Sequence, residues 1–508
     1  MKRNIILTTL LCLLILSSCE KYLDVKVSNG QVFITTANDC QLILDNYSVM
    51  NTNYPSDGQA SSDDSFLNEV SYLNESVTAE DRAIYTWNAN AIRLTASPQW
   101  RNAYFIIYNA NLVLEALDKI KAEGTTSQAT IDNLRGSALF FRSYCLWQTA
   151  QIYALGYDAA TANQNPGIPI KLTSDINEVS VRGTVQQTYS HITAELEEAA
   201  RLMNPTSSVA SRPNKAAAYA MLARVYLSMG DYAKAQSNAT AAIDIKGGLL
   251  NYNDATVNKS LTTNTPFTRF NVEVIFQSVM VSSLLTNPGA ESTSFARVDP
   301  ALLATFDDPN DWRKTVFLKQ NKTNVEVSDP TQANPNNKRV VSIFDGTYRF
   351  TGNYEQSSSN MFNGLAVDEL YLIRAECHAR AGRRDEAMAD LNTLLFNRWV
   401  TGTYINKTAT DANDALAKIL VERRKELMMR GQRWTDAKRM KLSLARDVKR
   451  IVGTATGIYS DTNNPVTYTV SWQYTPVSSY SLPAGDKRFA LLIPNEVIIN
   501  SSMAQNAR

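Results

Sequence analysis

Residues 219–242 read YAMLARVYLSMGDYAKAQSNATAA, and their spacing establishes the fold class. Large side chains recur at three- and four-residue steps from Tyr219 through Leu222 to Tyr226, which is the period of one helix face. The second half carries alanines where two helices would cross closely, and Gly230 interrupts the pattern between the halves. The stretch therefore predicts two short helices joined at Gly230.

A second copy of this pattern occupies residues 371–394, which read YLIRAECHARAGRRDEAMADLNTL. The matched small residues are Ala223/Ala375, Gly230/Gly382 and Ala235/Ala387. Their spacing resembles the tetratricopeptide repeat, a helix-turn-helix unit of about 34 residues. One such unit cannot bury its own apolar face, so the units must stack. The helical patterns between residues 100 and 155 are candidates to complete that stack.

The composition of residues 317–361 and 453–482 differs from that of the helical segments, because these stretches are rich in Asn, Ser, Thr, Val and Tyr. Residues 466–472 alternate like a strand, and the polar residues 51–80 read as a surface loop. Tetratricopeptide arrays seldom carry such long insertions, which often hold function on a rigid scaffold. We therefore expect a mostly α-helical protein, with a tetratricopeptide-like helical repeat scaffold and a loop-rich, irregular second layer.

The start of the chain has the layout of a secretory signal. Two basic residues precede an apolar run at 5–16, which at about 12 residues is too short to span a bilayer. Cys19 follows Leu-Ser-Ser, as in a bacterial lipobox, which implies cleavage before Cys19 and acylation of that residue. We expect a signal peptide at 1–18; the alternative is an ordinary secretory signal with a chance cysteine. Two further regions follow, at 19–250 and 270–508.

Composition narrows the classes of function. A net charge of +1 gives no sign of a nucleic-acid partner, and we expect contact with the membrane only through the lipid anchor. Cys40, Cys145 and Cys377 are too few and too scattered for a disulfide framework or a zinc site. Cys145 and Cys377 lie in apolar helical patterns and are expected to be buried.

Catalytic motifs are missing from the sequence. The chain has only two histidines, His191 and His378, neither with a metal-type partner four residues on, and it carries neither G-x-S-x-G nor a Gly-Lys-Ser/Thr loop. Glu422 and Glu426 lie four apart near an Arg-rich segment, with Glu426 expected to pair with Arg430, which is typical of a scaffold ion-pair network. We therefore expect a protein that is not an enzyme and that holds neither cofactor nor metal.

Aromatic and polar side chains gather in polar stretches where no core periodicity accounts for them. Such rings can stack on the C–H faces of sugars, while carboxylates and amides take the hydroxyls. Packing under a loop is the alternative for each ring, most of all for Trp312, since Asp311 and Arg313 beside it resemble a structural pair. Three groups stand out: Asp63, Asp64, Tyr72, Tyr85, Trp87 and Asn88; Trp312, Tyr348 and Tyr354; and Trp472, Tyr474 and Tyr480.

Several sequence blocks resemble the SusD/RagB family of outer-membrane lipoproteins from Bacteroidetes. They occur in the family's order along nearly the whole chain after Cys19. The blocks are Cys19–Asp24, Gly136–Tyr144, Tyr371–Glu376, Glu422–Leu427 and Ile493–Glu496. The sequence departs from the family at Ser137, Met429 and Arg430, which lie in expected scaffold helices.

The resemblance implies a cell-surface lipoprotein that captures a nutrient ligand. That ligand would be a glycan, delivered to a TonB-dependent, SusC-like transporter in the outer membrane. In the family, ligand contacts commonly come from the N-terminal loop region, which here contains Trp87. Two alternatives remain: capture of peptides, as in the RagB branch, and a non-nutrient scaffold for protein–protein contacts.

Overall fold

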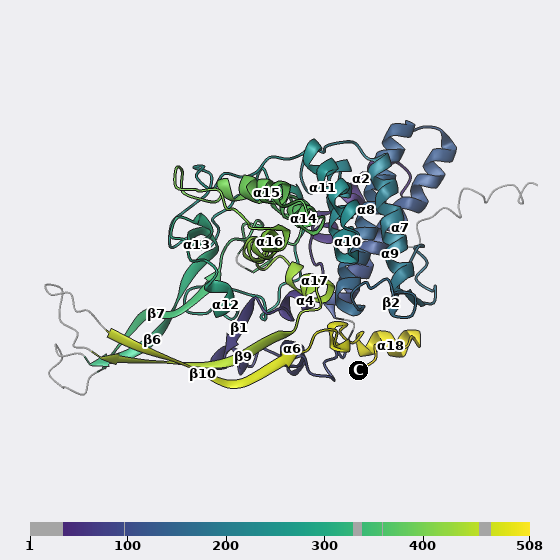
Figure 1. The fold of residues 1–508 in the computed structure, drawn as a ribbon. Helices are drawn as coiled ribbons and strands as arrows, with labels where there is room; N and C mark the ends of the chain where they lie inside the picture. Colours follow the sequence, from purple (N-terminus) through teal and green to yellow (C-terminus); the bar gives the residue numbers. More distant parts are fainter. Residues whose placement is uncertain (1–33, 96, 329–337, 358, 457–468) are drawn as a thin grey trace, which may run out of the picture.

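The computed structural model describes residues 34–95, 97–328, 338–357, 359–456 and 469–508. A body of long helices occupies one side of the molecule, and a β-sheet with two projecting hairpins occupies the other (Figure 1). The signal peptide and Cys19 lie outside the described residues. Within the described part of the chain, no helix combines the length and apolar character that crossing a membrane requires.

The long helices form one continuous array in which each helix packs against its neighbour in the array. Most of the main hydrophobic core lies among its first members. Its members are α7 (Pro98–Glu123), α8 (Gln128–Tyr153), α9 (Val185–Leu202), α10 (Lys215–Met229), α11 (Tyr232–Ile245), α14 (Val367–Arg380), α15 (Arg384–Phe396) and α16 (Ala412–Glu426).

The two predicted repeats are the helical hairpins α10–α11 and α14–α15, and they pack together through α11 and α14. Gly230 and Gly382 each have φ of 78°, the left-handed conformation that ends a helix and that glycine adopts without a Cβ clash. Ala223 and Ala375 are completely buried, as expected of residues at close helix crossings. The mostly α-helical, tetratricopeptide-like architecture is therefore confirmed, while the division into 19–250 and 270–508 stays a prediction.

The second layer is more regular than the sequence indicated, because much of it is a six-stranded sheet with strand order β10-β9-β1-β5-β7-β6. Two long antiparallel hairpins, β6–β7 and β9–β10, form its outer parts, and the short strands β1 and β5 join them. The strands are β1 (Ser65–Asn68), β5 (Arg297–Val298), β6 (Leu318–Ser328), β7 (Lys338–Phe350), β9 (Leu444–Thr456) and β10 (Thr469–Leu482). The strand expected at 466–472 agrees with β10 from residue 469 onward, and 466–468 lie outside the described residues.

Short elements complete the fold around the array and the sheet. Two small sheets pair β2 (Pro166–Pro169) with β3 (Arg182–Thr184), and β4 (Val274–Phe276) with β8 (Leu365–Ala366). The short helices are α2 (Ala37–Leu44), α3 (Tyr47–Met50), α4 (Asp57–Ala60), α5 (Glu69–Tyr72), α6 (Ala79–Tyr85), α12 (Pro300–Leu303), α13 (Trp312–Phe317), α17 (Gln432–Arg439), η1 (Lys487–Phe489) and α18 (Asn495–Ser501).

The expectation that residues 51–80 form a surface loop is wrong for much of that segment. Tyr54 and Ser56 are fully buried, and α4 contacts α17. Polar side chains here bond inside the protein rather than to water: Gln99 Oε1 accepts from the Ser56 backbone N–H, and Gln59 Oε1 accepts from the Gly431 backbone N–H. This polar segment therefore packs in the interior, where several of its polar groups bond to other parts of the protein.

The charged residues near Glu422 form a buried scaffold network, as expected. The Arg313 guanidinium bonds to Asp311 at 2.7 Å, to Glu422 at 2.6 Å and to Glu426 at 3.0 Å. Arg398 reaches the other Glu426 oxygen at 2.8 Å. Every charged side chain of this group is buried and bonded to a side chain of the opposite charge. Such pairing offsets the cost of burying ions in a protein interior.

One expected pair in this network is wrong. Glu426 does not pair with Arg430 four residues on; its oxygens are taken by Arg313 and Arg398. Arg430 instead bonds Asp368 of α14 at 2.8 Å. The tertiary contacts of two other buried arginines therefore override the local helical spacing.

Candidate functional site

The predicted N-terminal acidic residues lie in ion pairs just before β1, a central strand of the sheet. Asp63 Oδ1 accepts from Arg433 Nε at 2.6 Å, and Asp64 Oδ1 accepts from Arg424 Nε at 3.2 Å. Burial raises the pKa of Asp64, whereas at Asp63 the bond from Arg433 and the charge of Arg424 outweigh burial and lower the pKa. Both carboxylates thus have protein partners, and their role as ligand contacts stays a prediction.

Tyr85 and Trp87 lie in the interior, on either side of one arginine. The Arg446 guanidinium lies 4.3 Å from the centre of the Tyr85 ring and 4.8 Å from that of Trp87. Trp87 is only 2% exposed, and its indole N–H donates to the Ser61 carbonyl oxygen at 2.9 Å. This burial favours packing roles for both rings.

The remaining residues of that group are more accessible. Tyr72 is half-buried and inclined against Tyr85, with 5.9 Å between ring centres, and Asn88 is exposed. None of the six predicted N-terminal residues lines the hollows described below. Their part in ligand binding stays a prediction that these contacts do not strengthen.

The structure separates the three aromatic residues of the second group. Tyr354 is fully buried, and Trp312 is half-buried, with its indole N–H donating to Asn253 Oδ1 at 2.8 Å. Tyr348 lines a hollow of about 430 Å³ between α13 and the β6–β7 hairpin, which we term the Tyr348 hollow. Its ring meets Phe344 edge-on at 5.3 Å, which holds its orientation.

Tyr474, from the third predicted group, lines a hollow of about 290 Å³ with Phe66, which we term the Tyr474 hollow. Tyr474 is 43% exposed, and its hydroxyl donates to the Asp345 carbonyl oxygen at 2.6 Å. Lys449 Nζ lies 5.0 Å from the centre of the Phe66 ring, and Thr347 completes the polar lining. Phe66 is only 2% exposed, so the ring on which a ligand can stack is that of Tyr474, with the Lys449 ammonium beside it for polar edges.

Gly346 of β7 allows Tyr474 to reach this position. Its φ is 77°, and a Cβ placed there would lie 1.7 Å from the Tyr474 hydroxyl oxygen. Because Gly346 has no Cβ, the Tyr474 side chain of the β9–β10 hairpin can lie against β7. The Tyr474 ring then forms one wall of the hollow.

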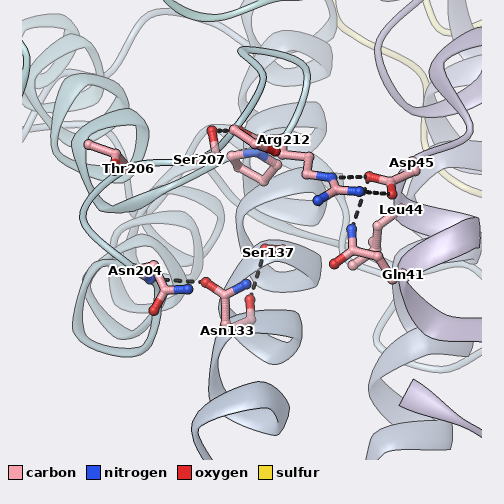
Figure 2. A pocket seen from close by; sticks show the side chains of 11 residues that line it. Gln41, Leu44, Asp45, Asn133, Ser137, Asn204, Thr206, Ser207 and Arg212 are labelled. Atoms are coloured by element: carbon pink, nitrogen blue, oxygen red, sulfur yellow. Dashed lines mark hydrogen bonds and ion pairs between the residues drawn. The ribbon is translucent and has the colours of Figure 1, made fainter. Parts of the chain in front are cut away.

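A third hollow, of about 160 Å³, lies in the helical body beside α2 and α8 and has no aromatic ring in its lining. Figure 2 shows its polar side chains bonded to one another. Arg212 pairs with Asp45 at 2.6 Å, and Asn133 Oδ1 accepts from the Asn204 backbone N–H at 3.0 Å. Because these groups already have partners, this hollow is less suited to a sugar than the two on the sheet.

The described linings of the sheet hollows hold no pair of carboxylates. The Tyr348 hollow has one, Glu291, and the Tyr474 hollow has none. Glycoside hydrolysis by the usual mechanism needs two carboxyl groups flanking the bond. Across the described residues, no three His, Cys, Asp or Glu side chains gather as a metal site would need. The geometry of the hollows suits binding.

Sequence reasoning found Tyr348 and Tyr474 but missed Phe66, Lys319, Arg349 and Lys449. Phe66 belongs to a four-residue strand inside a polar segment, where no periodicity is visible. The charged residues are drawn together by strand register, with Lys319 directly opposite Arg349 across β6 and β7. Only an expectation of that hairpin could have paired them.

Comparison with known proteins gives matches along most of the chain. Residues 21–227 match a family model described as "Starch-binding associating with outer membrane". Residues 283–497 match the model of the SusD family. A SusD-like protein of Formosa agariphila is 25% identical over 377 residues, which are 68% of this chain and 71% of that protein.

Solved structures show the same fold. A SusD superfamily protein of Bacteroides thetaiotaomicron aligns over 93% of this chain and 100% of its own, with a TM-score of 0.65 and 21% identity. A SusD-like carbohydrate-binding protein of Bacteroides vulgatus aligns over 92% and 97%, with a TM-score of 0.63 and 18% identity. At these identities the likeness establishes the architecture of helical array and sheet.

Proposed function

This chain belongs to the SusD family of outer-membrane nutrient-binding proteins, and from that premise we propose that it captures a glycan and passes it to a TonB-dependent, SusC-like transporter. The observation that carries the ligand class is the Tyr474 hollow. It presents the ring of Tyr474, which is 43% exposed, beside the polar groups of Thr347 and Lys449. Sugars offer apolar C–H faces to such rings and hydroxyls to such polar groups.

The hollow is suited to binding that is reversible. One exposed ring and a few hydrogen bonds give modest affinity, because both the ring and the sugar are partly satisfied in water. We expect a dissociation constant in the micromolar range or weaker, which corresponds to a binding free energy of about −8 kcal/mol or smaller in magnitude. Modest affinity suits a protein that must release its ligand to a partner.

The rest of the molecule is proposed to anchor the protein to the membrane and to bind the transporter. Acylation of Cys19 would hold the protein on the outer membrane, facing outward. The helical array, from α7 to α16, would contact the transporter, because a rigid array can match a large rigid surface. The sheet lies on the other side of the molecule from the helical body, and it would remain open to the ligand (Figure 1).

The test is binding of the mature protein to a panel of neutral and acidic oligosaccharides and of peptides, measured by isothermal titration calorimetry. Tyr474→Ala should weaken glycan binding by tenfold or more, about 1.4 kcal/mol. Phe396→Ala serves as a matched control, because this ring is 65% exposed on α15 of the array and lines neither sheet hollow. It should bind like the wild type.

Other outcomes would point to the alternatives. Binding of peptides and of no glycan would favour a peptide carrier of the RagB kind. If the protein binds neither glycans nor peptides but still binds the transporter, a scaffold for protein–protein contacts would be favoured. Shortening of any oligosaccharide during the titration would contradict a purely binding role.

A further inference from the structure

Two buried cations face each other in the Tyr348 hollow. Lys319 of β6 and Arg349 of β7 are directly opposite in the strand register, and both line the hollow. They are only 2% and 4% exposed. Like charges placed opposite each other on neighbouring strands destabilise a sheet, and burying a charge adds a desolvation penalty. This arrangement therefore has a cost in the free protein.

The described residues offer these two cations no carboxylate within ion-pair distance. Lys319 Nζ donates to the Thr315 carbonyl oxygen, and Arg349 donates to the Gln320 carbonyl oxygen and, at 3.0 Å, to Asn264 Oδ1. Arg349 Nε is buried with no acceptor. The hydrogen-bond acceptors of both cations are thus neutral, and one N–H of Arg349 has none; the charge of Glu291 acts on Arg349 only from beyond ion-pair distance.

The surroundings add positive charge. Lys314 and Lys322 also line the hollow, whose single carboxylate, Glu291, is bound to Lys322 at 2.5 Å. On the next strand, Arg297 lies opposite Arg349 and pairs with Asp345 at 3.5 Å. Burial, reinforced by the charge of Arg349, lowers the pKa of Lys319 to about 8, so the ammonium form still prevails at pH 7.

Among the described residues, the other buried arginines apart from Arg446 have carboxylate partners. Arg398 is bound to Glu273 and Glu426, and Arg224 is bound to Glu369. Lys438 and Arg446 are also buried without a carboxylate, but neither lines the hollows described here. Lys438 donates to the carbonyl oxygens of Gln151 and Ala154, and Arg446 lies between two rings and donates to the carbonyl oxygens of Ala60 and Tyr85. The pair in the Tyr348 hollow differs because an open cavity adjoins it.

We propose that the Tyr348 hollow binds the anionic group of an acidic sugar, a carboxylate or a sulfate ester, between Lys319 and Arg349. This inference rests on the proposed glycan-binding function and assigns the class of sugar. The oxyanion supplies the countercharge that the protein lacks, and Arg349 Nε gains an acceptor. Tyr348 offers its half-buried ring to the sugar face, and a volume of about 430 Å³ lies within the range of small-ligand sites.

Calorimetric titration with matched pairs of oligosaccharides tests this assignment. The pairs are an oligogalacturonate with its methyl ester, and a sulfated galactan oligosaccharide with its desulfated form. At least one acidic member should bind tenfold or more tighter than its neutral counterpart, and its affinity should fall as salt is added. The pair that shows the preference identifies the anionic group as carboxylate or sulfate.

Three variants locate the effect. Lys319→Met and Arg349→Gln should each remove the preference for the acidic member, while Lys314→Gln, at the exposed rim, should reduce it two- to threefold without touching the core. Lys441→Gln, a control cation outside the described hollows, should change nothing. Thermal melting checks that each variant is folded, and the rim variant keeps the test open if a core variant does not fold.

The possible failures are distinguishable. Equal binding of acidic and neutral members, or a preference that survives in all three hollow variants, would overturn the assignment and leave glycan capture standing. Loss of the preference in Lys441→Gln as well would also overturn it. Failure of every oligosaccharide to bind would overturn both the assignment and the proposed function.

Discussion

Replacing Gly346 by Ala tests how the Tyr474 hollow is built. The new Cβ would lie 1.7 Å from the Tyr474 hydroxyl oxygen and 3.0 Å from the ring carbon that bears it. The ring must then move, and its hydrogen bond to the Asp345 carbonyl is lost, at about 1 kcal/mol. The left-handed backbone, with φ of 77°, costs about 1 kcal/mol more for alanine. We expect the free energy of unfolding to fall by about 2 kcal/mol.

Urea denaturation gives this change, and two controls divide it into its parts. Gly402 has φ of 79° with no atom within 4 Å of a new Cβ, so Gly402→Ala measures the backbone cost alone, about 1 kcal/mol. In a Tyr474→Phe background the hydroxyl is gone, so Gly346→Ala should cost about 1 kcal/mol less than in the wild type. If Gly346→Ala costs no more than Gly402→Ala, or if the two changes at the hollow are additive, the contact between Gly346 and Tyr474 is not as described.

Three further predictions concern the array, the cations and the interior. Ala375→Leu should overpack a helix crossing and lower the free energy of unfolding, measured by urea denaturation, by about 1–3 kcal/mol. The control Ala122→Leu, on the exposed face of α7, should change it by less than about 0.5 kcal/mol. Equal effects of the two substitutions would contradict the repeat packing. Affinity for an acidic oligosaccharide should fall as pH rises through about 8, since Lys319 loses its proton there while Arg349 keeps its own. Lys319→Met should abolish this pH dependence. The same fall in the wild type and in Lys319→Met would refute the prediction. Trp87→Ala should lower stability by about 3–5 kcal/mol, because the ring is buried; intact stability with lost glycan binding would instead make Trp87 a ligand contact.

The helical part of the fold could be predicted because its signals are local. The period of apolar residues and the glycines Gly230 and Gly382 mark the helices of the two repeats within about 25 residues each. Matching alanines in the two copies then indicate that the helices stack. Each helix is thus marked by residues close to it in the sequence, and only the stacking needs the comparison of the two copies.

The sheet could not be predicted in the same way, because its pairing is non-local. β1 has four residues and pairs with β9, with Leu67 opposite Val448, while β5 has only two. Strands this short carry no detectable alternation. Residues 317–361 therefore read as loop, although β6 and β7 form a long hairpin there.

The candidate site was predicted in part. Two of the rings chosen from polar stretches, Tyr348 and Tyr474, line hollows, and their contact with a ligand stays a prediction. The same rule selected Trp87 and Tyr354, which are buried, because sequence alone does not reveal which polar segments fold inward. The opposed cations Lys319 and Arg349 have meaning only once their strands are paired.

The most direct test of the central claim is the position of a bound glycan in a crystal structure of the mature protein, soaked with the oligosaccharide that binds it most tightly. The account predicts electron density for a sugar ring against Tyr474, and for any acidic group between Lys319 and Arg349 in the Tyr348 hollow. Density confined to the polar hollow beside Arg212, or bound to the helical array with both sheet hollows empty, would contradict it.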